Sequence, residues 1–588
     1  MPRPAIPASY SILIAGKPLQ KSFEVIQVQI SRSINKIPSA EVFVVDKRSK
    51  GNAVPLSESA IFLPGNKIKI RAARKGVRQS AIFKGIIVKH RLKVDSNGKT
   101  VLTVSCFDEA IKLTVGRKNA SYREMKDSDV TRRMLDDAGL TASVHDTGIV
   151  HREIIQYYST DWDFIVKRAE TNGLFVTVED GKVGARKPNL DGRVALAATY
   201  GKDMALVEAE IDASTQFPAV TSSSWSPDKH KVVRANAVEP KVNKQGNLSG
   251  KQLAKMLGLK SYDLHTSAAV SDDGLAKWAN AQMLKSRLGR AKGTIVIPGN
   301  TKAKPGSLLL LRGLGARFDG NAYISGIQHN LGSAQWQTTI QFGLPSHIES
   351  EIDTPPASGL LPAISGLHIG KVTDTNDPDG EARVEVNIPT LGTDGGEVWA
   401  RLSNFFASNE VGAYFVPEVG DEVVLGFLNN DPRHPIVLGS LFSQIHQPPY
   451  GASNGAETIR GVVSKSQMKL TFDEANKELL IETKDGNAIT LSDDQHAVTI
   501  ADTNNNKIEM SADGILIESA ADLSIKSKGA LNLEADGAVN VKSKLDVNVE
   551  GLNVTNKANV NVTAQGGGKA ELKSSGNVVI QGAMVNIN

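Results

Sequence analysis

Three stretches of this 588-residue sequence approach a catalytic or ligand-binding motif, and each lacks a residue that the chemistry needs. The run SNGKT at 96–100 ends like a phosphate-binding loop, but Lys93 occupies the position of that loop's first glycine. The run GNLSG at 246–250 does not have the spacing of the G-x-S-x-G nucleophile motif. In DTNDPDGE at 374–381, Pro378 and a displaced glycine break the ligand order of a calcium loop. We therefore expect a polar hairpin turn at 374–381 and no catalytic motif in the other two runs.

The histidines and the single cysteine do not form a metal-binding pattern either. No H-E-x-x-H spacing occurs, and His434 and His446 are far apart and lie beside prolines or polar residues. Cys106, the only cysteine, excludes an intramolecular disulfide framework and any cysteine-rich metal module. The net charge of +5 is small for this length, which argues against a dedicated nucleic-acid binder. The sequence predicts no catalytic residue, no cofactor and no bound metal.

The first residues contain no secretion signal that we can identify. The start, MPRPAIPASYSILIAG, has an apolar run of only Ile12 to Ile14, which is shorter than a signal peptide needs. No window approaches 18 consecutive apolar residues, so no membrane-spanning helix is expected. These features predict a protein that is made and folded in the cytoplasm.

Residues 1–350 alternate in apolar and polar residues over many short runs, which predicts mostly β-strands. Asn97-Gly98 is typical of a two-residue hairpin turn. In the second predicted helix, Thr160 can cap the start and Gly173 can end it. The polar stretch 238–252 is expected to be a mobile loop. The three predicted helices cover 127–138, 161–172 and 271–288.

The next part of the chain predicts a small barrel between two linkers. Residues 351–365 are rich in proline and have no hydrophobic periodicity, so we interpret them as a linker. Residues 366–447 contain five strand-like runs separated by turn signals, which suits a closed barrel of the oligonucleotide-binding (OB) type. Residues 448–458 are interpreted as a second, shorter linker.

The last part, 459–588, is built from pairs of apolar residues two positions apart. It has no proline and one aromatic residue, Phe472. A strict eight-residue step is typical of a repeat architecture whose unit is one short strand and a polar turn. Looser pairs continue to Val585 and Ile587 at the end of the sequence. The pairs at the strict step are Ile515 and Ile517, Leu523 and Ile525, Leu531 and Leu533, Val539 and Val541, and Val547 and Val549.

An eight-residue repeat is too short for one chain to enclose its own core. Three chains wound about a common axis could bury these pairs, each chain forming one wall of a triangular prism. We therefore predict a homotrimeric, triple-stranded β-helix needle over 459–588, with the ten paired residues in its core. An elongated adhesin-like stalk and an aggregation-prone β-rich tail are two further interpretations of the same pattern.

Three segments then resemble one known family, the VgrG-type spikes of type VI secretion systems and related contractile injection systems. These segments are QYYSTDWDFIVKRAETNGLFV at 156–176, PGSLLLLRGLGARFDGNAYISGIQHNL at 305–331 and PEVGDEVVLGFLNNDPRHPIVLGSLFSQIHQPPY at 417–450. One departure is Ser159-Thr160, where many members have Glu-Ser. The structural residues that carry the resemblance are Trp162, Phe164, Gly173, Pro417, Gly420, Asp421, Asp431, Pro435 and Gly439.

The resemblance implies a role for each part of a mainly β, multidomain fold. Residues 1–350 would be a phage-tail-hub-like domain with two β-barrels, adapting an Hcp-like hexameric tube to a threefold spike. The OB barrel would form the neck, and 459–588 the puncturing needle. A separate PAAR-like cap would dock at Val585, Ile587 and Asn588. Baseplate wedge proteins, possible effector cargo and, transiently, a target membrane would be further partners, with no nucleic acid.

The resemblance implies a non-enzymatic spike that is assembled in the cytoplasm and ejected on contraction. About ten residues separate the barrel from the needle, and no further domain follows the last repeat, so we expect no enzymatic domain. The baseplate spike of an extracellular injection particle or phage tail would share the same features. A spike with an effector domain and a trimeric adhesin stalk are weaker interpretations of the sequence.

Overall fold

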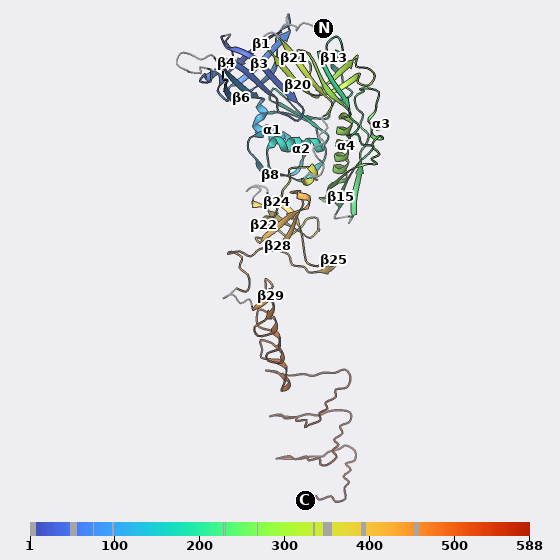
Figure 1. Cartoon of the computed structure of the whole chain (residues 1–588). Helices are drawn as coiled ribbons and strands as arrows, with labels where there is room; N and C mark the ends of the chain where they lie inside the picture. Colours follow the sequence, from blue (N-terminus) through green and yellow to red (C-terminus); the bar gives the residue numbers. More distant parts are fainter. Residues whose placement is uncertain are drawn as a thin grey trace. The chain divides into compact units, whose positions relative to one another are not determined.

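The computed structural model shows a mainly β chain whose described residues fall into two compact units, Met1–Pro448 and Pro449–Asn588 (Figure 1). Each unit is treated by itself below. The Asn97-Gly98 turn and Asn588 lie outside the described residues. The structure describes residues 8–20, 22–46, 56–74, 76–96, 99–226, 229, 231–266, 268–332, 335–344, 356–389, 396–451 and 458–587.

The first unit contains a 13-stranded sheet built from two separate stretches of sequence. The earlier strands are β1 (Ala8–Ile14), β2 (Lys17–Pro18), β3 (Glu24–Ser33), β4 (Ser39–Asp46), β5 (Lys67–Arg74), β6 (Ser80–Val94) and β7 (Thr100–Phe107). The later strands are β13 (Val194–Thr199), β14 (Leu206–Ile211), β18 (Ala291–Pro298), β19 (Leu308–Arg312), β20 (Gly320–Leu331) and β21 (Trp336–Phe342). Strands β6 and β7 pair as the antiparallel hairpin that the sequence predicts.

Strand β20 connects the two stretches of sequence that are expected to form two β-barrels. Its first residues pair with β19, and its last six, Gly326–Leu331, pair with β3. One long strand therefore joins the two stretches into a single hydrogen-bonded sheet. The two stretches still have separate hydrophobic cores, one around Ile70 and Val104 and one around Ile295 and Ile340.

The helices lie close to their predicted positions, with one addition. Helices α1 (Asp127–Asp137), α2 (Asp161–Thr171) and α4 (Asp272–Leu288) match the predicted ranges, and the Thr160 side chain accepts from the backbone N–H of Asp163. The short α3 (Gly250–Ala254) begins inside the stretch predicted to be a mobile loop. Ser249 and Gln252 form a reciprocal capping box there, which stabilises the helix start, so the loop prediction is wrong for residues 250–252.

Smaller sheets and short 3-10 helices also lie in the first unit, outside the barrel strands. Helix α4 packs along β15 and β16 (Figure 1). The strands are β8 (Lys118–Lys126) with β10 (Val150–Ser159); β9 (Thr141–Val144), β11 (Phe175–Glu179) and β12 (Lys182–Arg186); and β15 (Val220–Ser226), β16 (Lys231–Asn236) and β17 (Tyr262–Thr266). The short 3-10 helices are η1 (Ala60–Phe62), η2 (Glu109–Thr114), η3 (Pro356–Gly359) and η5 (Leu428–Asn430).

The predicted five-stranded barrel is confirmed. Its strands close in the order β22-β23-β24-β28-β27, and their bounds are β22 (His368–Asp374), β23 (Arg383–Asn387), β24 (Glu397–Leu402), β27 (Glu422–Phe427) and β28 (Pro435–Ser440). A two-stranded hairpin, β25 (Ala407–Ser408) and β26 (Val411–Gly412), extends from the connection between β24 and β27.

The described part of the proline-rich stretch before the barrel is not a free linker. Ala357, Leu360, Leu361 and Ile364 are at most 3% exposed, and the first three pack against apolar residues of α4. Hydrophobic burial holds this segment in place, although its prolines and lack of periodicity are typical of a linker.

The second unit begins with a seven-stranded antiparallel meander. Its strands are five residues long, and the described residues 519–587 form no helix or strand within one chain. The prediction of eight-residue repeats from residue 459 is therefore wrong for 459–518, where longer turns separate most of the strands. The strands are β29 (Ile459–Val463), β30 (Lys469–Asp473), β31 (Glu478–Glu482), β32 (Ala488–Ser492), β33 (Ala497–Ala501), β34 (Lys507–Ser511) and β35 (Gly514–Glu518).

Candidate functional site

The contact between the barrel and the preceding region, here called the junction, is built on strand β10. Ile155 of β10 is 1% exposed and belongs to the same hydrophobic cluster as the barrel's own core residues Val386 and Leu425. Beside it, the Tyr157 ring meets the edge of the His368 ring with 5.7 Å between centroids. The barrel core is thus completed by a side chain from another part of the chain, which fixes the barrel on β10.

Charged side chains surround this apolar contact. Arg123 of β8 reaches Glu385 Oε1 at 3.1 Å and donates to the Glu397 carbonyl oxygen at 2.8 Å, so it connects β8 to two barrel strands. On the same side, Glu153 accepts a hydrogen bond from Ser121 Oγ at 2.9 Å. Burial raises the pKa of Glu153 to about 7, although the Ser121 hydrogen bond and the Arg123 charge act in the opposite direction.

A buried cluster around Asp127 supports the same strand from behind. Asp127 accepts from Arg168 Nε at 2.6 Å and Nη2 at 2.9 Å, and from Asn172 Nδ2 at 2.8 Å. His151 of β10 lies 3.2 Å from the same carboxylate. Burial alone would raise the pKa of Asp127, but Arg168 and His151 hold it well below its usual range. The cluster ties α1, α2 and β10 together with satisfied charges.

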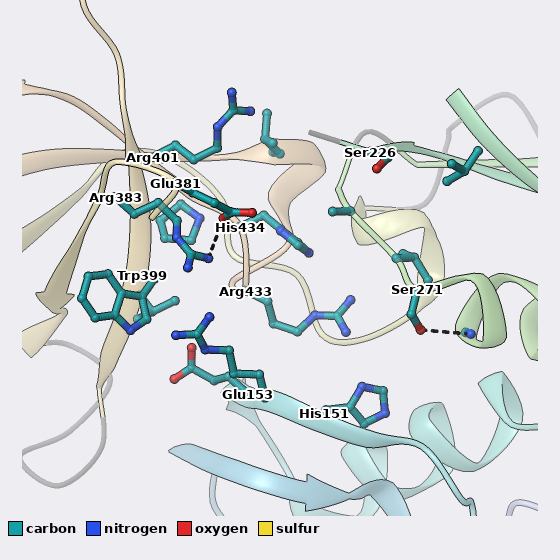
Figure 2. Close-up of a pocket in the computed structure, with 18 of the residues that line it drawn as sticks. His151, Glu153, Ser226, Ser271, Glu381, Arg383, Trp399, Arg401, Arg433 and His434 are labelled. Carbon is teal, nitrogen blue, oxygen red and sulfur yellow. Dashed lines mark hydrogen bonds and ion pairs between the residues drawn. The ribbon is translucent and has the colours of Figure 1, made fainter. Parts of the chain in front are cut away.

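A cavity of about 520 Å³ lies at the junction, lined by β10, the start of α4 and the barrel (Figure 2). Most of its charged side chains already have partners. Arg383 pairs with Asp377 at 2.8 Å, and Arg433 with Asp431 at 2.7 Å. Burial would raise the pKa of Asp431, yet Arg433 lowers it to about 2. Arg383 and Arg433, both labelled in Figure 2, therefore hold loops through their own carboxylate partners and are not open anion-binding groups.

The predicted signature residues fall into two groups that do not meet. Trp162 and Phe164 are buried in one hydrophobic cluster, and Gly173, at φ +68, ends α2. In the barrel, Pro417 is half-buried beside a tight turn in which the Gly420 N–H donates to Val372 O and Glu418 N–H donates to Asp421 Oδ2. Asp431 is buried in the turn that joins β27 to β28, Pro435 is buried at the start of β28, and Gly439 is exposed on the same strand.

The meander of the second unit presents two columns of apolar side chains on one face. Directly paired residues such as Ile489 and Ile500, or Leu491 and Val498, share this face because opposite residues of antiparallel strands point the same way. The columns are Val462, Leu470, Ile481, Ile489, Ile500, Ile508 and Ile517, and Phe472, Leu479, Leu491, Val498, Met510 and Ile515. We call these thirteen residues the apolar ladder. Within one chain none of them is buried.

The predicted core pairs after the meander are likewise exposed in a single chain. Their exposed fractions run from 57% for Val547 to 77% for Leu533 and Val541, and the other members are Leu523, Ile525, Leu531, Val539 and Val549. Ile515 and Ile517 lie on β35, at the end of the ladder. At the other end of the unit, Val585 and Ile587 are exposed.

Sequence reasoning missed most of the ladder and all of the junction. Pairs such as Leu470 with Phe472 and Ile489 with Leu491 keep the two-residue spacing, so a search that allowed nine- and ten-residue steps would have found them. Ile155, in contrast, has no local signal, because its partners lie more than 200 residues later in the chain.

Within the described residues, no helix is both long enough and apolar enough to cross a bilayer. Over the same residues, no group of three or more His, Cys, Asp or Glu side chains is placed to hold a metal ion.

Two family models match the first unit, one over its N-terminal region and one over the barrel. Residues 5–333, more than half of the chain, match the family model described as the Alg8 N-terminal domain. Residues 368–442 match the model described as the type VI secretion system/phage-baseplate injector OB domain.

Among curated proteins, the chain is 29% identical over 136 residues to the actin cross-linking toxin VgrG1 of Vibrio cholerae, covering 21% of this chain and 12% of that protein. It is 32% identical over 76 residues to the type VI secretion system spike protein VgrG3 of Vibrio cholerae, covering 12% and 8%. The matched stretches thus span about a tenth of these relatives' own length. Among solved structures, a chain of the half-lidded Francisella PdpA-VgrG complex has a TM-score of 0.53 at 11% identity, covering 87% of this chain and 88% of that chain.

Proposed function

Because this chain belongs to the VgrG-type spike proteins, and its residues 5–333 to the family described as the Alg8 N-terminal domain, we propose that it works as a non-enzymatic, homotrimeric spike. The observation that carries the proposal is the apolar ladder. A sheet with one apolar face is stable in water only when that face packs against something. Three copies facing a common axis would cover three such faces at once.

The opposite face of the same sheet supports this arrangement. Its central column contains two leucines, Leu480 and Leu516, and otherwise Gly461, Thr471, Thr490, Thr499 and Glu509, so it is more polar than either column of the ladder. The two faces therefore differ in the way expected for the wall of a prism, with an apolar interior and a polar exterior.

The remaining parts would transmit force and hold partners. The junction, with Ile155 in the barrel core and Arg123 bonded to two barrel strands, resists displacement of the barrel from the preceding region. We infer that the N-terminal region contacts a hexameric, Hcp-like tube, and that a PAAR-like cap docks on the exposed Val585 and Ile587. Effector cargo and baseplate proteins would be further partners, and ejection on contraction would bring the needle to a target membrane.

The mass of the full-length protein in solution tests the proposal. Sedimentation or light scattering should give three times the 62.8 kDa of one chain. Ile500→Asp, which places a charge on the ladder, should abolish the trimer because an unpaired buried charge is costly. Thr499→Asp on the same strand but the opposite face should leave the trimer intact. A monomeric parent protein, or equal effects of the two substitutions, would contradict the proposal.

A further inference from the structure

The connection between β24 and β27 forms a projecting arm with an aromatic surface. We call residues 405–415 the aromatic arm; Figure 1 shows its strand β25 at the end of an extended segment, away from the barrel strands. Phe405 is 89% exposed, Tyr414 77% and Phe415 63%. Four of its eleven residues are aromatic, and one, Glu410, is charged. Such an exposed aromatic cluster is typical of an interaction surface.

The arm has a defined backbone conformation. Strands β25 and β26 pair through Ala407 with Gly412, and the Ala413 N–H donates to Phe406 O at 2.9 Å. Gly412 has φ +153, and a Cβ at this position would lie 2.6 Å from that same carbonyl oxygen. The aromatic side chains are therefore presented on a preformed hairpin, which lowers the entropic cost of binding.

The barrel's outer surface has a second, different apolar surface. Leu367, Ile369, Val424 and Leu438 lie on or beside β22, β27 and β28; we call them the apolar strip. Ile369 pairs directly with Val424, and Leu367, Ile369 and Leu438 are 69%, 43% and 51% exposed. The outer residues of β23 and β24, such as Glu385 and Glu397, are charged and face the junction.

We propose that the aromatic arm of one copy packs on the apolar strip of the next copy, so that the arms link the barrels into a closed ring. An interface between two unlike patches is heterologous, and repeated heterologous contacts give a ring when the rotation closes. Each copy then uses its arm once and its strip once, and the aromatic side chains of every arm are covered. This inference rests on the proposed function, which sets the number of copies in the ring at three.

A second copy fits these surfaces better than an unrelated partner. Both surfaces are apolar and lie on the same small domain. Every copy therefore carries both an arm to be covered and a strip that can cover the arm of another copy. The strip itself contains no charged residue, and the residues at its edge, Lys371 and Glu422, are opposite neighbours of opposite charge on β22 and β27. Apart from Glu410 on the arm, neither surface offers a charge to a highly charged partner.

Chemical crosslinking of the full-length protein tests this contact. Asn409→Cys places a thiol at the tip of the arm, and Ser440→Cys places one beside the strip; both keep every apolar side chain. Native Cys106 is 0% exposed, and burial raises its pKa to about 12, so it should not react. Chains with one substitution each, co-expressed and treated with a short bis-maleimide, should give a covalent dimer on a denaturing gel. The double variant should give a covalent trimer.

The matched control replaces Ser440→Cys by Arg401→Cys, an exposed position on the charged side of the same barrel. At least a tenfold lower yield of covalent dimer is expected. A trimeric protein that does not crosslink between arm and strip, or that crosslinks equally to position 401, would overturn the ring contact and leave the proposed trimer standing. A protein that is monomeric by mass would overturn both.

Discussion

Asp127 shows how single residues hold the junction in place. Its carboxylate accepts hydrogen bonds from Arg168 and Asn172, and Arg168 is itself 4% exposed. Asp127→Ala would leave the Arg168 guanidinium buried without its partner, which should cost about 3–5 kcal/mol of stability. Asp129→Ala, which removes a pair with Arg132 on the surface of the same helix, should cost about 0–1 kcal/mol. Thermal unfolding of both variants measures the difference, and equal losses would contradict this account.

Glu153 gives the junction a dependence on pH. Its pKa in the folded protein, about 7, is above the ordinary value of 4.5, so the folded state binds the proton more tightly than the unfolded chain does. Stability contributed by the protonated form is therefore present at low pH and is lost as the pH rises from about 4.5 to about 7.

Glu153→Gln imitates the protonated carboxyl and should remove this loss. At pH 8 the variant should be about 2 kcal/mol more stable than the parent protein, and near pH 4.5 the two should be nearly equal. Thermal unfolding measured at both pH values checks the prediction. A difference that is the same at both pH values would show that burial does not perturb this carboxyl.

At the scale of elements, two signature glycines of the barrel should respond differently to the same substitution. Gly420 has φ +103 in the turn before β27, where nothing lies within 4 Å of an added Cβ. Gly420→Ala should therefore cost about 1–2 kcal/mol through backbone strain alone. At Gly439 on β28 an added Cβ also meets no other atom, and the backbone φ is not positive. Gly439→Ala should therefore change stability by less than about 0.5 kcal/mol. Thermal unfolding separates the two variants, and an equal effect would show that the turn tolerates a side chain.

The elements that could be predicted are those with a local signal. Three helices and the barrel strands follow from hydrophobic period, capping residues and turn residues, all of which lie within a few positions of each other. The capping box of α3 could also have been found in the sequence, but the polar residues around it favoured the prediction of a loop. The segment at 356–364 was misread because its burial depends on α4, about 80 residues earlier.

Whether the interaction surfaces could be predicted also depends on how close their residues lie in the sequence. The later members of the apolar ladder could be predicted from a two-residue spacing, whereas the Asp127 cluster could not, because its members come from α1, α2 and β10. The aromatic arm was visible in the sequence as Phe405-Phe406 and Tyr414-Phe415. What the sequence could not show is that the fold leaves these side chains exposed.

At the scale of the whole molecule, the apolar pairs of the second unit and the two apolar surfaces of the barrel point to the same conclusion. They are exposed in one chain, and each would become buried in the proposed assembly of identical chains. The pairs past residue 518 provide the sharpest test, because a single chain forms no strand there among the described residues. Their order should therefore depend entirely on neighbouring copies, as expected for short strands that pair only between chains.

Leu531→Asp tests this dependence directly. Leu531 is 58% exposed in one chain and, in a trimeric needle, would face the axis, where three introduced carboxylates would meet. Desolvation and mutual repulsion should then prevent trimer formation. Asn532→Asp, one position away and on the opposite side of the predicted strand, adds the same charge in water and should leave the trimer unchanged. Sedimentation of the two full-length variants compares them. A Leu531→Asp protein that stays trimeric, with an unchanged melting temperature, would show that this pair lies outside the core.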